Sequence, residues 1–177
     1  MLTENQLQDI FEIAEILSNS DRDLFAQLKE AVFATDPNHI LNMFESYLSA
    51  EEFDQFLDQV TESEKDNLWL ILVTLLTKQD YIFPCDIEVD LTDFINGFDQ
   101  LKQVRAAGIL LKLDPDGLNP GANLAQWLVT INTKFEAEGL AAGLLSITED
   151  KFYVFFNQIE KVARLQQLAQ GLDIVIA

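Results

Sequence analysis

The chain has 177 residues, of which 49% are hydrophobic, and its formal net charge is −19. That apolar share can form a real core and excludes a globally disordered chain, while the single cysteine, Cys85, excludes an intrachain disulfide framework and a multi-cysteine zinc site. A strongly negative surface repels nucleic acid and anionic lipid. The longest apolar run, 68–76, is much shorter than the roughly 20 residues of a membrane span. With no secretory signal visible, we expect a cytoplasmic protein that binds neither nucleic acid nor membrane.

Five helices are predicted before residue 79, because apolar residues recur there at helical spacing behind residues that favour N-caps. The first runs from Thr3 to Leu17. The third begins at Asp36-Pro37, an N-cap followed by proline at the first helical position. The fifth contains the run 68–76, which is apolar on nearly every side and so indicates a helix buried all round. The expected caps are Thr3, Ser20 in a loose capping box with Asp23, Asp36, Ser49, and Ser63 with Asp66.

The pattern then changes from helical to strand-like spacing. Residues 86–90 alternate acidic and aliphatic side chains, which predicts a short edge strand. Asp90 with Asp93 is similar to a capping box, and it predicts a helix that continues to about Ala106. Gly97 weakens this helix, because glycine within a helix costs about 1 kcal/mol relative to alanine.

The middle of the second half is less regular. Residues 107–113 fit either the end of a helix or a strand, and residues 114–121 are the clearest loop of the chain. We expect Asn119 and Pro120 to cap a helix that runs to about Glu138, and we expect Gly139 and Gly143 to end it and lead into the sheet.

The last part of the chain predicts a small sheet. Two short runs rich in β-branched and aromatic residues flank a polar pair of hairpin length, Glu149-Asp150. A stretch with helical spacing follows, and Gly171 is expected to stop it in the left-handed conformation. The predicted elements are strands over Leu144–Thr148 and Lys151–Phe156, a helix over Glu160–Gln170, and a strand over Leu172–Ile176.

These elements predict an α+β fold, with a helix-rich N-terminal half packed on a small, mainly antiparallel C-terminal sheet of strand-strand-helix-strand order. No internal repeat or low-complexity linker interrupts the chain. We therefore expect one domain over 1–177, with 1–80 as a candidate helical subdomain. The aromatic strand carries large apolar groups on both faces, which is simplest if both faces are covered.

Negative charge is unevenly distributed along the chain. Residues 1–100 hold 22 Asp or Glu against four Lys or Arg, whereas residues 101–177 hold eight against seven. Such a field either keeps the protein soluble or attracts a basic partner. The densest segment, which we call the acidic strip, is the candidate docking surface for a cationic protein, with fast and salt-sensitive association. Its residues are Glu51, Glu52, Asp54, Asp58, Glu62, Glu64 and Asp66, with Lys65 among them.

No catalytic, metal or cofactor motif is present. His39 and Cys85 could form a dyad only through the fold, and Asp86 and Glu88 oppose a thiolate at Cys85. Residues 114–121 do not fit a calcium loop, because the fifth and sixth positions are not a ligand and a glycine. Walker A, GxGxxG and GxSxG patterns are absent from the sequence. We expect no cofactor and no enzyme activity.

The strand, acidic turn and aromatic strand over 144–156, with the following helix and final strand and the segment 86–90 ahead of a helix, resemble uncharacterised bacterial families of domains of unknown function. The resemblance covers about the last ninety residues. Some small acidic bacterial proteins of similar build are immunity or adaptor proteins, so the resemblance implies binding rather than catalysis.

The resulting hypothesis is a non-catalytic, immunity- or adaptor-like module that binds a basic protein through its acidic half, as a monomer or homodimer. Two alternatives remain. A hydrolase-type enzyme would gather acidic residues in a cleft, and a structural homo-oligomer would use an open face of the aromatic strand.

Overall fold

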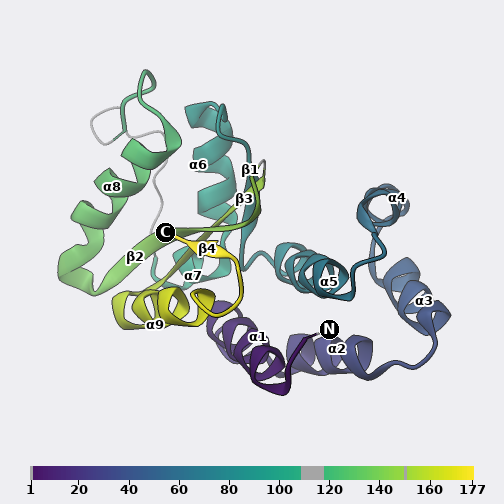
Figure 1. Cartoon of the computed structure of the whole chain (residues 1–177). Coiled ribbons are helices and arrows are strands. Elements are labelled where there is room, and N and C mark those ends of the chain that lie inside the picture. The colour runs from purple at the N-terminus through teal and green to yellow at the C-terminus, as the bar shows by residue number, and fades with distance from the viewer. Residues whose placement is uncertain (1, 109–117, 150) are drawn as a thin grey trace. The chain divides into compact units, whose positions relative to one another are not determined.

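The computed structural model describes residues 2–108, 118–149 and 151–177. It confirms the α+β class, with helices throughout and a four-stranded antiparallel sheet in the C-terminal half (Figure 1). The chain divides into two compact units, Met1–Lys78 and Gln79–Ala177, called here the first and the second unit. The single domain over 1–177 stays a prediction.

The first unit consists of helices. Its elements are α1 (Glu4–Leu17), α2 (Arg22–Phe33), α3 (Pro37–Tyr47), α4 (Ala50–Gln59) and α5 (Glu64–Lys78). The predicted fifth helix, α5, packs against α1, α2 and α4, and the side chains of 68–73 together with Leu75 and Leu76 are buried. Within the described residues, no helix is both long and apolar enough to cross a membrane.

Most of the predicted N-caps in the first unit are confirmed. Thr3 and Ser49 form complete capping boxes, Asp36 caps α3 with Pro37 behind it, and the Ser63 hydroxyl accepts a hydrogen bond from the Asp66 backbone. The second helix is the exception. Its N-cap is Asp21, whose carboxylate accepts bonds from two backbone N–H groups, while Ser20 takes a left-handed conformation just before it. An N-cap residue normally has an extended backbone, which Asp21 has (φ −67°, ψ 110°) and Ser20 does not, so Asp21 caps this helix.

The second unit combines helices with the sheet. Its elements are β1 (Phe83–Cys85), α6 (Leu91–Gln100), α7 (Lys102–Ala106), α8 (Leu124–Phe135), the 3-10 turn η1 (Glu136–Glu138), β2 (Leu140–Thr148), β3 (Lys151–Gln158), α9 (Ile159–Ala169) and β4 (Val175–Ile176). The predicted strand-strand-helix-strand order is confirmed by β2, β3, α9 and β4. The strand order across the sheet is β1-β3-β2-β4, and every pairing is antiparallel.

The sheet is covered on both faces (Figure 1). Val154 and Phe156 of β3 belong to a buried cluster with apolar side chains of α6 and α8. Side chains alternate along a strand, so Tyr153 and Phe155 lie on the other face, and α9 packs against β2, β3 and β4. Both of these aromatic side chains are buried, and burial raises the pKa of Tyr153. The prediction that the aromatic strand is covered is confirmed.

The edge strand lies a few residues earlier than predicted. The strand is Phe83–Cys85, and residues 86–90 form a turn in which the Val89 N–H donates to the Asp86 carbonyl, 3.1 Å away. The alternation of acids and aliphatics in 86–90 thus reflects an exposed turn that leads into the Asp90 cap of α6. Only one partner strand, β3, is hydrogen-bonded to β1, so β1 is an edge strand that tolerates Pro84.

Several other boundaries differ from the prediction. β2 begins at Leu140 rather than Leu144, so that Gly143 lies within the strand, and β4 begins at Val175 rather than Leu172. The helix expected to reach Ala106 is broken at Leu101, where the backbone is extended (ψ 132°) and the apolar side chain is buried. Asn123, in a capping box with Gln126, caps α8 in place of Asn119. Asn119 instead accepts bonds from the Gly121 N–H and the Trp127 indole N–H.

The conformation at the end of α9 differs from the prediction. Gly171 directly follows the C-cap Gln170, as expected, but it does not adopt the left-handed conformation, which is taken by Asp173 at φ 55°. Gly139, by contrast, is left-handed after η1. The predictions for 109–117, which include most of the undecided segment 107–113 and the first half of the loop 114–121, lie outside the described residues, as does Asp150 of the hairpin turn.

Candidate functional site

The acidic strip spans α4, the connection to α5 and the first turn of α5 in the first unit. Its helices form where the sequence predicts, because Ser49 and Ser63 cap them and acidic residues in a first turn suit the positive end of the helix dipole. Six of its seven carboxylate residues are exposed, and Glu52 is half-buried. The predicted residues therefore lie along one continuous helix–turn–helix segment, and the carboxylates of all but Glu52 are exposed to solvent.

On α4 the acids are arranged on one face. Glu51, Asp54 and Asp58 are spaced by three and four residues, so they lie one above another along the helix. The opposite side is anchored by Phe56, whose buried ring stacks on Phe44 of α3 with centroids 4.6 Å apart. Burial of Phe56 thus fixes which face of α4 carries the charge.

Apolar side chains border these acids. Leu57 follows Asp54 by three residues and Val60 caps the helix C-terminus, and the two are 40% and 44% exposed. Mixed acidic and apolar surfaces suit a protein partner better than a free ion, since apolar contact area supplies affinity and charge supplies steering.

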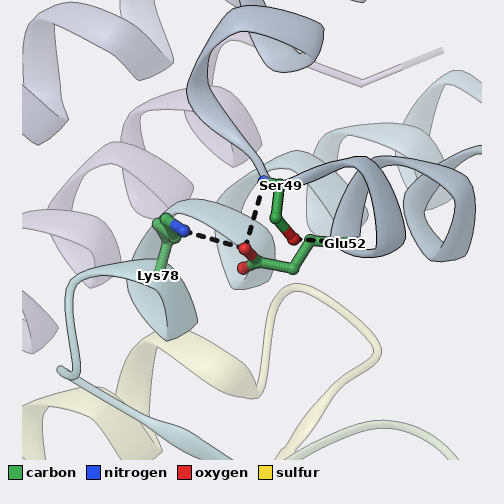
Figure 2. Close-up of polar contacts among 3 residues, drawn as sticks. All are labelled: Ser49, Glu52 and Lys78. Atoms are coloured by element: carbon green, nitrogen blue, oxygen red, sulfur yellow. Dashed lines mark hydrogen bonds and ion pairs between the residues drawn. The ribbon is translucent and has the colours of Figure 1, made fainter.

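Glu52 has a structural role within the strip. Its Oε1 accepts a hydrogen bond from the Ser49 N–H at 3.1 Å and pairs with Lys78 Nζ at 2.8 Å, while its own N–H donates to Ser49 Oγ (Figure 2). The Lys78 hydrogen bond, followed by those from Ser49, lowers the pKa of Glu52 below its ordinary value of 4.5. Glu52 therefore ties α4 to the end of α5, whereas the six other acids of the strip are exposed.

The stabilisation that the Glu52–Lys78 ion pair provides should depend on pH. A lowered folded-state pKa means that the stabilisation is present above the unfolded-state pKa and is lost as the pH falls through the folded-state value. Because the Lys78 and Glu52 side chains are still 33% and 41% exposed to solvent, a double-mutant cycle of Glu52→Gln and Lys78→Met should give a coupling energy below about 1 kcal/mol at neutral pH. The coupling should decrease as the pH falls through the folded-state pKa of Glu52, so it should be smaller at about pH 3 than at neutral pH. Urea unfolding of the four proteins measures it, and equal coupling at both pH values would contradict the assignment.

The second unit contains a groove that sequence reasoning missed. Its volume is about 710 Å³, and it lies where β1 leaves the sheet, between the 86–90 turn, the start of α6 and the end of the β2–β3 hairpin. Five acidic residues line it: Asp86, Glu88, Asp90, Asp93 and Glu149. The sequence feature that indicates this groove is the series of acidic residues that follows Pro84, whose alternation with aliphatic residues predicts a strand instead.

Both units carry a negative net charge. The first unit has 16 Asp or Glu against four Lys or Arg, a net charge of −12, and the second has 14 against seven, a net of −7. Six of the acids in the second unit lie in 79–100, a stretch without Lys or Arg. The negative charge is thus concentrated at two places, the acidic strip and the surroundings of the groove.

The His39–Cys85 dyad gains no support. Burial, and secondly the charge of Asp86, raise the pKa of the Cys85 thiol to about 12, so it stays protonated at neutral pH. His39 is exposed and its Nε2 lies 2.8 Å from Glu30 Oε1. Among the described residues, no three His, Cys, Asp or Glu side chains are grouped so as to hold a metal ion.

Comparison with known proteins finds one family. Residues 9–177 match the model of the family described as Domain of unknown function (DUF6630), so the match includes the helical first half as well as the sheet. No curated protein and no solved structure matches the chain.

Proposed function

Because the chain belongs to the family Domain of unknown function (DUF6630), whose description names no activity, we propose its function from its own surfaces: it is a non-catalytic module that binds a basic protein through the acidic strip. The single observation that carries the proposal is the exposed face of α4, where Glu51, Asp54 and Asp58 lie in line beside exposed Leu57.

The charge and the apolar area of this surface both favour a protein as the ligand. Clustered carboxylates raise the association rate of a cationic partner and repel anionic ones, and this effect weakens as salt screens the charges. Leu57 and Val60 add apolar area at the edge of the same surface. The resemblance to bacterial domains of unknown function supports an immunity- or adaptor-like role in the cytoplasm, as a monomer or homodimer.

The proposal is tested by neutralising the face without changing the fold. In the variant Glu51→Gln/Asp54→Asn/Asp58→Asn, we expect a basic partner to be retained about tenfold less than by the wild type at about 50 mM NaCl. The immobilised chain is incubated with lysate of its native cell, and retained proteins are quantified by mass spectrometry at low and high salt.

A matched control distinguishes the effect of charges on the acidic strip from the effect of the net charge of the whole chain. Glu136→Gln/Glu138→Gln/Glu160→Gln removes the same number of exposed charges from the second unit, and it should retain the partner as the wild type does. If no basic protein distinguishes the two triple variants, or if its retention does not fall with salt, the acidic strip is not the docking surface.

The groove is the observation that favours the alternative, a hydrolase-type enzyme with acidic residues in a cleft. Carboxylate catalysis requires an acid whose pKa is raised, typically by an apolar burial site. The five acidic residues of the groove are exposed instead, which supports binding over catalysis. Hydrolysis of glycoside, ester or phosphate substrates that disappears in Glu88→Gln or Asp93→Asn would establish the enzyme.

A further inference from the structure

The groove of the second unit combines an apolar surface with acidic walls. Pro84, Ile87, Val89 and Phe152 supply apolar lining, and no Lys or Arg is among the described residues that line it. Ile87 is the most informative, because its side chain is 69% exposed in a turn between two acids. A large aliphatic side chain held in solvent at the mouth of a groove gains free energy when a ligand covers it.

The adjoining sheet edge cannot recruit a strand well. The outer edge of a sheet normally pairs with an added strand through backbone N–H and C=O groups. Here the edge strand β1 has three residues, and its central one, Pro84, has no N–H. A ligand is therefore held by its side chains, in the groove, rather than by continued backbone pairing.

We propose that this groove binds an extended polypeptide segment of a partner in which Lys or Arg residues alternate with aliphatic ones. In such a segment successive side chains point to opposite sides, so aliphatic groups can contact Ile87 and Phe152 while ammonium or guanidinium groups meet Glu88 and Asp93. The volume of about 710 Å³ is within the range of about 300–1,000 Å³ typical of ligand sites. Charge complementarity selects the occupant, since every charged residue in the described part of the lining is acidic.

The groove is chemically a binding site rather than a reactive one. Cys85, the one thiol or hydroxyl residue among the described lining residues, is buried and keeps its proton, donating weakly to the Asp86 carbonyl at 3.5 Å. Asp90 is engaged as the cap of α6, where it accepts from the Asp93 N–H at 2.8 Å. Glu88 and Asp93 are the exposed carboxylates that a test can change without removing that cap.

The probe is a fluorescein-labelled decapeptide of alternating Lys and Val, titrated with the full chain and followed by fluorescence anisotropy at about 50 mM NaCl. We expect saturable binding, at least about tenfold tighter than for a peptide with Gln in place of Lys. A peptide with Ser in place of Val should also bind at least about fivefold more weakly. Equal binding of the Lys/Ser peptide would mean that charge alone acts, and would overturn the proposal.

Two matched pairs of variants locate the site. Glu88→Gln/Asp93→Asn should weaken Lys/Val binding about five- to tenfold, and the control Glu136→Gln/Glu138→Gln less than about twofold. Ile87→Ser should weaken it about fivefold, whereas Val129→Ser, at a side chain 66% exposed on α8, should not. Equal losses in a variant and its control, or no saturable binding by the wild type, would overturn the proposal.

This inference stands apart from the proposed function, because the acidic strip and the groove lie in different units and share no residue. The variant Glu51→Gln/Asp54→Asn/Asp58→Asn should bind the Lys/Val peptide as the wild type does. If that variant loses the peptide while the groove variants keep it, the strip alone binds basic segments and the groove proposal fails.

Discussion

Replacing Phe156 with alanine is expected to lower the free energy of unfolding by about 4 kcal/mol, the largest effect that we predict for a single substitution. The Phe156 ring is 1% exposed. It makes edge contacts with Phe98 of α6 and Phe135 of α8, with centroids 5.3 and 5.9 Å away. Truncation would leave a cavity between the sheet and two helices and remove both aromatic contacts.

Urea unfolding followed by circular dichroism measures this loss. Phe156→Leu keeps most of the apolar volume and should cost about 1.5 kcal/mol or less. Phe33→Ala makes the same truncation at a ring that is 63% exposed and should cost no more than about 0.5 kcal/mol. If Phe156→Ala were no worse than Phe33→Ala, the described packing of the sheet against α6 and α8 would be wrong.

Gly143→Ala is expected to cost about 3 kcal/mol, although it adds a single methyl group. A Cβ at this position would overlap Cζ of Phe155 and would lie 2.9 Å from the carbonyl oxygen of Ala177. Gly143 is the cross-strand partner of Phe155 in the β2–β3 register. The buried ring thus lies over the glycine, and neither it nor the backbone carbonyl can move away without disturbing the sheet.

Gly171→Ala is the matched control for this second prediction. No atom lies within 4 Å of a Cβ placed at Gly171, and its φ is not in the left-handed region. The substitution should be neutral or stabilise the protein by up to about 1 kcal/mol, because alanine restricts the unfolded chain. Thermal and urea unfolding of the two variants compare the positions, and similar stabilities would contradict the close approach at Gly143.

Neither prediction depends on the proposed binding surfaces, because Phe156 and Gly143 belong to neither the acidic strip nor the lining of the groove. The β2–β3 hairpin nevertheless positions Phe152 opposite Cys85 at the last pair of the β1–β3 register. If Phe156→Ala or Gly143→Ala loses peptide binding, the cause would therefore be partial unfolding of the second unit. The groove variants change exposed side chains, so their binding losses are separable from stability.

Local patterns in the sequence determined the helices of the first unit and most of the sheet. Caps such as Thr3, Asp36 and Ser49 act through hydrogen bonds to residues two or three positions away, so the sequence itself contains both partners. The all-round burial of α5 follows from its composition. The acidic strip could also be predicted, because its residues are neighbours in the sequence and carboxylates are normally exposed to solvent.

Tertiary structure decided the features whose partners are far apart in the chain. The place of β1 depends on its pairing with β3, about seventy residues later in the sequence. Asn132 of α8 exchanges two hydrogen bonds with the backbone of Ala142, at 2.7 and 3.1 Å, and no local pattern indicates this contact. The groove likewise requires the 86–90 turn and the β2–β3 hairpin to meet. Spacing rules describe neighbours along the chain, whereas a sheet edge or a groove exists only after distant segments pair.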